Sequence, residues 1–395
     1  MNDIPSSTRP PVRLAGQRAR LPRNRFDRME WAGAFGDLGT LIPFVTAYIA
    51  VLHMDPMGIL LGFGLPLVAC GWFYRTPFPV QPMKAVGAAA ATGAGSMAML
   101  HGAPVIAAAW LTGAFWLAIG LSGLATRIAR WVPREVGRGI VLGLSLGFMR
   151  DGARMMVSDV GLAAAGLALA FLLRRSKALP AMFALLLLGT AWSLATDASL
   201  LSELGHVAFA PRWPQWHGSD FSWSDLLTGA IYLALPQIPL TLGNAIIGTK
   251  EENNRLFPER PVSIRGIAVS TGLINLFGAT VGGVPMCHGA GGIVAHTSFG
   301  ARTGGASIIL GTLLIGLALG FSGSVELLLR TLPAAVVGVI LFIAGALLAR
   351  GNLPRLADKR SAVLVLLTAG AALWNVAAAF VFGLGLAWLL KRRAR

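Results

Sequence analysis

Long apolar stretches alternate with short polar ones along almost the whole chain. A helix needs about 20 apolar residues to cross a lipid bilayer. By this measure the sequence predicts an all-α polytopic membrane protein with about fourteen transmembrane segments in two sets of seven. The first set covers 31–52, 56–74, 77–97, 104–125, 138–150, 157–173 and 179–196; the second covers 224–249, 264–283, 285–300, 304–322, 333–349, 361–373 and 374–390.

The division into two sets of seven predicts an inverted repeat. A unit with an odd number of spans takes opposite orientations when it occurs twice, as in many secondary transporters. The short third and tenth segments, opened by Pro82 and Pro285, occupy matching places and indicate a substrate site at the membrane midplane. We expect a basic cytoplasmic tail at 1–29, a first repeat at 30–198, an external loop at 199–222, a second repeat at 223–391 and a basic tail at 392–395.

Charged residues are scarce and lie between the apolar runs. They make up 13% of the chain, against about a quarter in soluble domains, while hydrophobic residues make up 55%. The net charge of +16 comes from clusters of Arg and Lys in the short connections, as expected of cytoplasmic loops. The charge therefore predicts a cell-membrane protein that contacts lipids and has both termini in the cytoplasm. It does not indicate a nucleic-acid partner.

Motifs typical of enzymes and cofactor sites are missing from the sequence. Cys70 and Cys287 have no partners at the spacing of a zinc site. His288 and His296 are eight positions apart without a His-Glu-x-x-His pattern, and no Gly-rich stretch matches a P-loop. We therefore expect a transporter without cofactor or metal.

The third segment begins in a proline-rich stretch at 76–84 (TPFPVQPMK). Each proline fixes φ and lacks an N–H group, so we expect extended chain followed by a helix that begins at Pro82. The N–H groups of Lys84, Ala85 and Val86 then have no partners within the helix, and the helix dipole adds roughly half a positive charge. Such a helix start is a natural anion site.

The tenth segment repeats this arrangement. Pro285 opens it, and Cys287, His288, Gly289 and Ala290 follow in its predicted first turns. Small side chains let a ligand contact the backbone directly. If the two half-helices point their N-termini at each other, an oxyanion between them meets donors from both sides. The alternative for His288 is a hydrogen-bonded histidine of the core.

Two charged residues lie inside predicted spans. Lys84 in a span costs about 2.5 to 3.5 kcal/mol on insertion scales, which indicates a function unless the side chain reaches the membrane surface. Asp37 lies in the glycine-rich run 33–40 (GAFGDLGT), which ends at Thr40. We expect Asp37 either to pair with Lys84 or to accept hydrogen bonds from backbone N–H groups at a helix break.

A polar face is predicted on the eighth segment. Gln237, Thr241 and Asn244 are four and three positions apart and so share one side of a helix. Pro236 and Pro239 disturb that helix and free carbonyl groups. The face fits the lining of a site, and hydrogen bonding between helices is the alternative.

Four motifs together resemble the molybdate transporter branch of the sulfate permease superfamily. They are FGDLGT (35–40), PVQPMK (79–84), LPQIPLT (235–241) and PMCHGAGG (285–292), in the family's order. The resemblance implies two inverted seven-helix repeats, arranged as a gate domain and a mobile core domain whose third and tenth segments hold the substrate. It also implies import of molybdate by an elevator-like movement.

The resemblance assigns the substrate contacts to the two half-helices and the eighth segment. The residues are Gln81, Lys84, Ala85, Gln237, Asn244, Cys287, His288, Gly289 and Ala290. Asp37, Thr40 and Asp151 are candidates for ion coupling or structural support. The chain stops at Arg395 just after its last predicted segment, so we expect no C-terminal regulatory domain. A homodimer is compatible with the resemblance.

Alternative functions stay open at this point. Sulfate and tungstate carry the same charge as molybdate, and the sequence does not fix the cavity size that separates such anions. A proton-coupled nucleobase permease needs buried carboxylates to bond ring nitrogens, and the tenth segment has none. An anion channel needs a filter motif or a ring of like charges, and an intramembrane enzyme needs an activated nucleophile or a metal triad. The sequence contains neither pattern.

Overall fold

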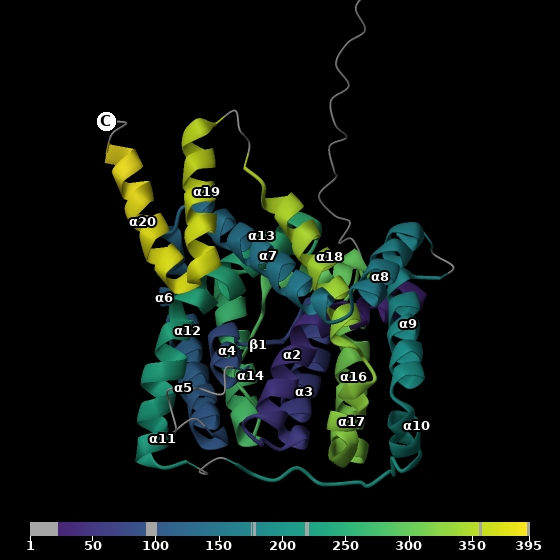
Figure 1. The fold of residues 1–395 in the computed structure, drawn as a ribbon. Helices are drawn as coiled ribbons and strands as arrows, with labels where there is room; N and C mark the ends of the chain where they lie inside the picture. The colour runs from purple at the N-terminus through teal and green to yellow at the C-terminus, as the bar shows by residue number, and fades with distance from the viewer. Residues whose placement is uncertain are drawn as a thin grey trace, which may run out of the picture.

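The protein is almost entirely helical in the computed structural model (Figure 1), which confirms the predicted all-α class. The model describes residues 23–91, 101–174, 176, 179–217, 221–354 and 358–392. Most of both predicted basic tails, at 1–22 and 393–395, and the end of the third predicted segment, at 92–97, lie outside these described residues.

The first half of the chain supplies the following elements. They are α1 (Arg28–Ala34), η1 (Phe35–Asp37), α2 (Leu38–Ala50), α3 (Pro56–Tyr74), β1 (Gln81–Pro82), α4 (Lys84–Ala91), α5 (Gly102–Leu121), α6 (Leu124–Arg130), α7 (Arg134–Met156), η2 (Val157–Asp159), α8 (Val160–Leu173), α9 (Ala181–Thr196) and α10 (Ala198–Gly205). Helices η1 and η2 are single 3₁₀ turns that join longer helices.

The second half of the chain supplies the remaining elements. Its elements are α11 (Trp223–Thr228), η3 (Gly229–Ala234), α12 (Leu235–Leu240), η4 (Thr241–Gly248), α13 (Thr249–Leu256), α14 (Ile264–Thr280), β2 (Met286–Cys287), α15 (Ala290–Ser298), α16 (Gly305–Phe321), η5 (Ser322–Ser324), α17 (Val325–Arg330), α18 (Ala334–Asn352), α19 (Lys359–Trp374) and α20 (Val376–Arg392). Helices η3 and η4 are π-helical stretches.

Several helices can cross a membrane by length and composition. Within the described residues there are seven such stretches: Arg28–Ala50, Pro56–Tyr74, Gly102–Leu121, Arg134–Leu173, Trp223–Leu256, Gly305–Arg330 and Ala334–Asn352. The pair α9 and α10, bent by 103°, makes an eighth if it counts as one span. The number of fourteen crossings therefore stays a prediction.

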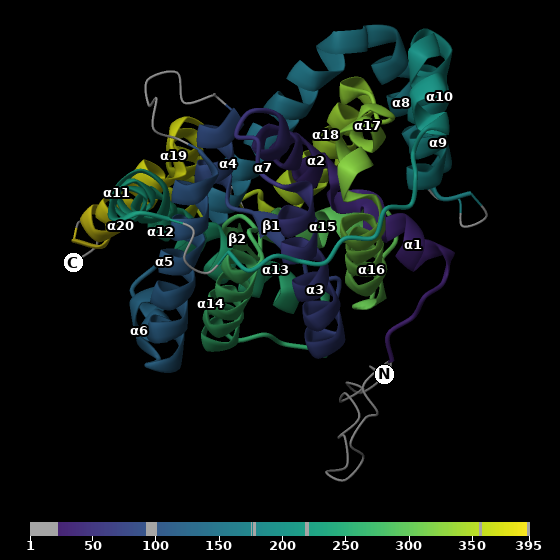
Figure 2. The ribbon, with the colours of Figure 1, turned by 90° about the horizontal axis from the view of Figure 1, so that it is seen from below.

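The helices pack as two bundles. In the first bundle α3 lies against α16 and α14 lies against α5 (Figures 1 and 2). Helix α4 contacts α2 and α12, and α15 contacts η1 and α13 as well as α18 of the second bundle. In the second bundle α7 lies against α18 and α19, with α8 and α9 on one side and α20 on the other. Each bundle presents large apolar side chains outward, for example Phe73 (77% exposed) and Phe171 (64% exposed). Lipid is the solvent that such surfaces fit, and the chain is a multi-pass membrane protein.

The segment predicted as an external loop begins with a helix. Helix α10 forms because Asp197 accepts hydrogen bonds from the N–H groups of Ser199 and Leu200. The chain then runs extended across one end of the molecule (Figure 2). Arg212 holds it there: its N–H donates to Leu319 O at 2.9 Å, and its guanidinium pairs with Asp55 at 3.1 Å.

Candidate substrate-binding site

The third and tenth predicted segments meet in the middle of the first bundle at a crossing, which consists of β1 and β2. Strands β1 and β2 pair antiparallel, with Gln81 opposite Cys287 and Pro82 opposite Met286. Asn275 of α14 binds the other edge of β2, donating to Met286 O at 2.6 Å and accepting from Met286 N at 2.8 Å. The buried backbone of β2 is thus bonded on both edges, which fixes the crossing in place.

Both half-helices begin later than their prolines predicted. Helix α4 begins at Lys84 and α15 at Ala290, each directly after the crossing. The predicted starts at Pro82 and Pro285 are wrong because Pro82 lies in β1 and Pro285 directly precedes β2. Pro285 O accepts a hydrogen bond from Met83 N at 2.9 Å, next to the strand pair. The two helix starts therefore lie next to each other across the crossing.

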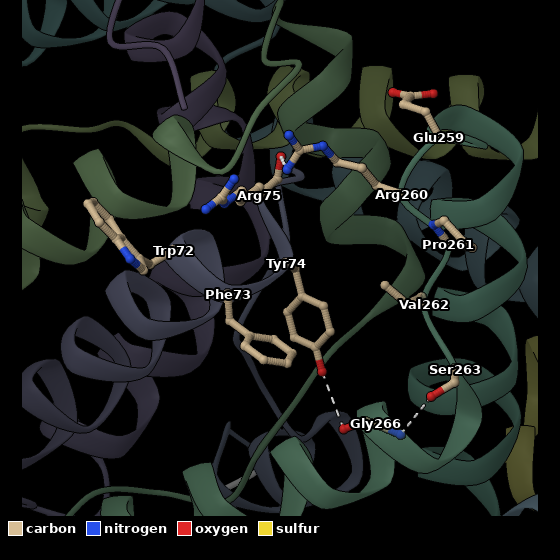
Figure 3. A pocket seen from close by; sticks show the side chains of 10 residues that line it. All are labelled: Trp72, Phe73, Tyr74, Arg75, Glu259, Arg260, Pro261, Val262, Ser263 and Gly266. Carbon is tan, nitrogen blue, oxygen red and sulfur yellow. Dashed lines mark hydrogen bonds between the residues drawn. The ribbon is translucent and has the colours of Figure 1, made fainter. Parts of the chain in front are cut away.

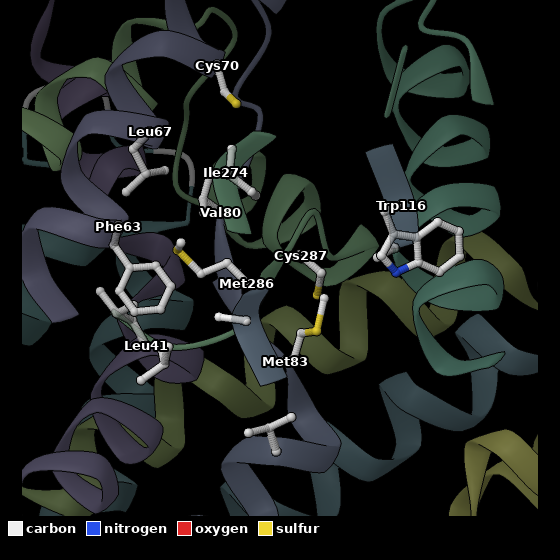
Figure 4. Packing of buried hydrophobic residues seen from close by; sticks show 14 of the residues in the cluster. Leu41, Phe63, Leu67, Cys70, Val80, Met83, Trp116, Ile274, Met286 and Cys287 are labelled. Carbon is white, nitrogen blue, oxygen red and sulfur yellow. The ribbon is translucent and has the colours of Figure 1, made fainter. Parts of the chain in front are cut away.

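Apolar side chains surround the crossing on the side of α3 and α14. Met83, Met286 and Cys287 lie in the middle of a buried cluster that includes Phe63 and Ile274 (Figure 4). Cys287 is 2% exposed. The predicted contact residue Cys287 thus has its side chain in this cluster.

Asp37 holds the side chain of Gln81, in β1, by a hydrogen bond. Its Oδ1 accepts hydrogen bonds from Gln81 Nε2 and from Thr40 Oγ1, both at 2.5 Å, and Gln81 Nε2 also lies 2.8 Å from Thr40 Oγ1. The 3₁₀ turn η1 places Asp37 at a break between α1 and α2. The predicted break is there, but side chains supply the partners, and no ion pair joins Asp37 to Lys84 in the described part of the chain.

Gln81 is left with an unsatisfied oxygen that faces Gly289. Its Oε1 is buried and has no hydrogen-bond partner among the described residues. A Cβ at Gly289 would lie 1.9 Å from this oxygen, and Asn244 Nδ2 is 3.8 Å from the same point. Gly289 therefore has to be glycine for the crossing to close around Gln81.

Lys84 points its charge at an aromatic ring of the second bundle. Its Nζ is buried without a hydrogen-bond partner in the described structure and lies 3.9 Å from the centre of the Phe148 ring. The same ring covers the first turn of α15, since a Cβ at Gly291 would lie 2.5 Å from Phe148 Cε2. A cation over a ring gains about 0.5 to 2 kcal/mol, less than the cost of burying an ammonium group.

The polar face of the eighth segment reaches the start of α4. Gln237 Oε1 accepts a hydrogen bond from Ala85 N at 2.9 Å, and Gln237 Nε2 donates to Thr241 Oγ1 at 3.0 Å. Helix continues from Trp223 to Leu256, and the disturbance near Pro236 and Pro239 takes the form of the π-helical stretches η3 and η4. Gln237, Thr241 and Asn244 are all buried, but so is every residue of η4, so burial does not single out one face of this stretch.

His288 links the stretch before β1 to helix α14 by hydrogen bonds. Its Nδ1 lies 2.8 Å from Pro79 O, and its Nε2 lies 2.8 Å from Ser270 Oγ. A carbonyl only accepts, so Nδ1 carries a proton and donates it to Pro79 O. Its own carbonyl accepts a hydrogen bond from Thr249 Oγ1. Both ring nitrogens are used within the protein, which matches the alternative of a core histidine.

We expect His288→Gln to lower stability without weakening substrate binding. A glutamine cannot reach both Pro79 O and Ser270 Oγ, and each buried group left without a partner costs about 1 to 3 kcal/mol. Thermal unfolding in detergent should show a lower melting temperature, while the dissociation constant for the substrate should stay close to that of the unmodified protein. A large loss of affinity with an unchanged melting temperature would instead show that His288 contacts the substrate.

Asp37 should act through Gln81, and two substitutions separate this role from proton coupling. Asp37→Asn keeps an oxygen that accepts from Gln81 and Thr40, so we expect most of the transport rate to remain. Asp37→Ala leaves both donors without a partner and should reduce transport about tenfold. Uptake measured across a range of pH provides the contrast: if Asp37→Asn removes the pH dependence, the carboxylate itself carries a proton.

Three buried residues of the surrounding helices were not among the predicted site residues. Phe148 carries no polar atom, so only its contact with Lys84 reveals it. Tyr48 has a buried hydroxyl without a partner in the described structure. His296 donates from Nδ1 to Gly33 O at 2.8 Å and leaves Nε2 buried without a partner there. Polar residues inside predicted spans were the available signal.

Asp151 stands apart from this network. It pairs with Arg150 at 2.9 Å, and its side chain is 47% exposed. A metal ion has no evident place either: among the described residues, no group of three or more His, Cys, Asp or Glu side chains is arranged to hold one.

Comparisons with known proteins point in one direction. A family model described as "Molybdate transporter of MFS superfamily" matches residues 29–148 and 229–348. Molybdate transporter 2 of Arabidopsis thaliana is 30% identical, over 93% of this chain and 87% of its own length. Molybdate transporter 1 of Chlamydomonas reinhardtii is 28% identical, over 93% of this chain and 92% of its own length.

Solved structures of anion transporters share the fold. Murine Solute Carrier 26 family member A9 in the inward-facing state gives a TM-score of 0.62 at 11% identity, over 95% of this chain and 70% of that chain. The transmembrane domain of the cyanobacterial bicarbonate transporter BicA gives a TM-score of 0.57 at 17% identity, over 90% of this chain and 97% of that chain. At such identities the likeness concerns the fold alone.

Proposed function

The chain belongs to the molybdate transporter family, and from this premise we propose that it carries molybdate through the membrane into the cytoplasm. The observation that carries the proposal is the buried ammonium group of Lys84. It lies at the start of one half-helix and, through Phe148, beside the start of the other. A tetrahedral dianion supplies the partner that this charge lacks.

The site attracts an oxyanion by charge and by backbone donors. Lys84 contributes one positive charge, and the first turn of α15 contributes N–H groups and the positive end of a helix dipole. Ala290 and Gly291 carry a small side chain or none, so oxygens of the anion can reach their N–H groups. The N–H group of Gly292 already donates to Gly289 O at 3.0 Å. Displacing the Phe148 ring from Lys84 opens this space.

A nucleobase is a poorer fit to the same residues. The purine or pyrimidine ring needs a carboxylate that is free to bond its nitrogens, and Asp37 already accepts from Gln81 and Thr40. Helix α15 has no acidic residue. Sulfate and tungstate share the charge and shape of molybdate, and selection among the three depends on the size of the opened site.

We infer that transport proceeds by alternating access of the elevator type. The crossing, α4 and α15 belong to the first bundle, whereas Phe148 belongs to α7 of the second. Sliding of the first bundle along α7 carries Lys84 away from the ring and exposes the oxyanion to one side. The family model matches two stretches of equal length, 29–148 and 229–348, which supports the repeat on which such a movement is commonly built.

Uptake by the purified protein in liposomes tests the function. Molybdenum inside the vesicles, counted by mass spectrometry, should rise with time and persist in a large excess of external sulfate. Protein-free liposomes provide the blank. Abolition of uptake by sulfate would make the protein a general oxyanion carrier, and absence of uptake in correctly folded protein would contradict molybdate transport.

A further inference from the structure

A charged cavity lies at the end of α3, away from the crossing. Its volume is about 700 Å³. The last turn of α3, from Trp72 to Arg75, forms one wall, and residues 259–263 with Gly266 form the other (Figure 3). This connection between α13 and α14 belongs to the basic loops on the side predicted to face the cytoplasm.

Two guanidinium groups share this pocket. Arg260 donates from Nη1 to the backbone carbonyl of Arg75 at 3.3 Å, which brings the Arg260 guanidinium to the backbone of Arg75. Burial and the neighbouring charge of Arg75 lower the pKa of Arg260, while Glu259 opposes this shift. Glu259 is the one acidic side chain among the lining residues and lies at the edge of the pocket (Figure 3). An anion between the arginines relieves their repulsion.

Exposed aromatic rings identify the kind of anion. Trp72 is 67% exposed and Phe73 is 77% exposed at the end of a membrane-spanning helix. Aromatic side chains at this depth lie among lipid headgroups and the first carbons of their chains. We propose that the pocket binds the phosphate headgroup of an anionic phospholipid. Arg75 and Arg260 hold the phosphate, and the acyl chains run along Trp72 and Phe73.

The pocket is connected to the crossing by hydrogen bonds. Tyr74, which lines the pocket, donates from its hydroxyl to Ser270 Oγ at 2.8 Å, and Ser270 Oγ lies 2.8 Å from His288 Nε2. The Tyr74 ring also stacks on Phe78 with centroids 3.7 Å apart. A lipid that orders the end of α3 therefore also stabilises His288 and β1.

Retention of phosphatidylglycerol by the purified protein tests this proposal independently of transport. Native mass spectrometry after extraction from vesicles of phosphatidylglycerol and phosphatidylcholine should find phosphatidylglycerol bound to the unmodified protein. The double variant Arg75→Gln/Arg260→Gln should retain about tenfold less. The matched control Arg127→Gln/Arg130→Gln removes the same charge from α6 and should retain as much as the unmodified protein.

Two further measurements keep the proposal open to refutation. Glu259→Gln removes the opposing charge and should increase retention, which provides a test even if the double variant does not fold. Phosphatidylglycerol added to protein in neutral detergent should raise the melting temperature, whereas inorganic phosphate should not. Equal stabilisation by inorganic phosphate would identify a small-anion site, and equal lipid retention by the Arg75→Gln/Arg260→Gln protein would overturn the site altogether.

Discussion

The Lys84→Ala variant should lose molybdate binding while keeping its fold. The Lys84 ammonium group is buried, has no hydrogen-bond partner in the described structure and lies at the start of α4. Removing one member of a buried charge pair costs roughly 2 to 5 kcal/mol, which weakens binding about 30-fold or more. Isothermal titration of the purified protein with molybdate measures this loss directly.

Matched substitutions show whether charge or shape is lost. Lys84→Arg keeps the charge on a larger, planar group and should bind molybdate with intermediate affinity. Lys250→Ala removes a lysine that pairs with Glu251 on the surface, and its affinity should equal that of the unmodified protein. Since burial of Lys84 without an anion is unfavourable, Lys84→Ala should melt at the same or a higher temperature. Undiminished molybdate binding by Lys84→Ala would mean that the substrate binds elsewhere in the protein.

The Gly289→Ala variant should lose both stability and transport. The added methyl group would lie 1.9 Å from Gln81 Oε1, and Gln81 is held by Asp37 and Thr40 and cannot turn away freely. Overpacking of this kind costs about 1 to 3 kcal/mol and here also separates β1 from β2. A lower melting temperature and lost uptake are the expected results.

Two further variants test the cause of this loss. Gly147→Ala, in α7, adds a methyl group with nothing within 4 Å and should leave the melting temperature unchanged or slightly higher. Combining Gly289→Ala with Gln81→Ala removes the oxygen that clashes, so this double variant should recover part of the lost melting temperature. Recovery is partial because Asp37 and Thr40 then lack Gln81 as a partner. If the double variant melts as low as Gly289→Ala, the contact with Gln81 is not the reason.

Rare residues in the sequence mark the candidate site. A lysine, an aspartate and two proline-led segments inside apolar runs are costly in a membrane, and all four lie at or beside the crossing. The fold class followed from the length of the apolar runs alone. Gln237 and Thr241 are hydrogen-bonded, as their spacing of four positions predicts. Asn244 lies in the π-helical stretch η4, where all residues are buried and α-helical spacing does not hold.

The contacts within the site did not follow from the sequence. Asp37 bonds Gln81 rather than Lys84. The two residues are 44 positions apart, and only the tertiary structure around β1 brings them side by side. Phe148 reaches Lys84 from the other bundle, and no local pattern encodes that meeting. The extended stretch after Pro285 was read as helix because small residues fit a helix start equally well.

Anomalous scattering at the molybdenum absorption edge tests the central claim most directly. Crystals of the protein grown with molybdate should give one strong peak per chain, in contact with Lys84 Nζ and the first turn of α15. Crystals of Lys84→Ala grown in the same solution should lack that peak. A peak away from the crossing in the unmodified protein, for example between Arg75 and Arg260, would contradict the account.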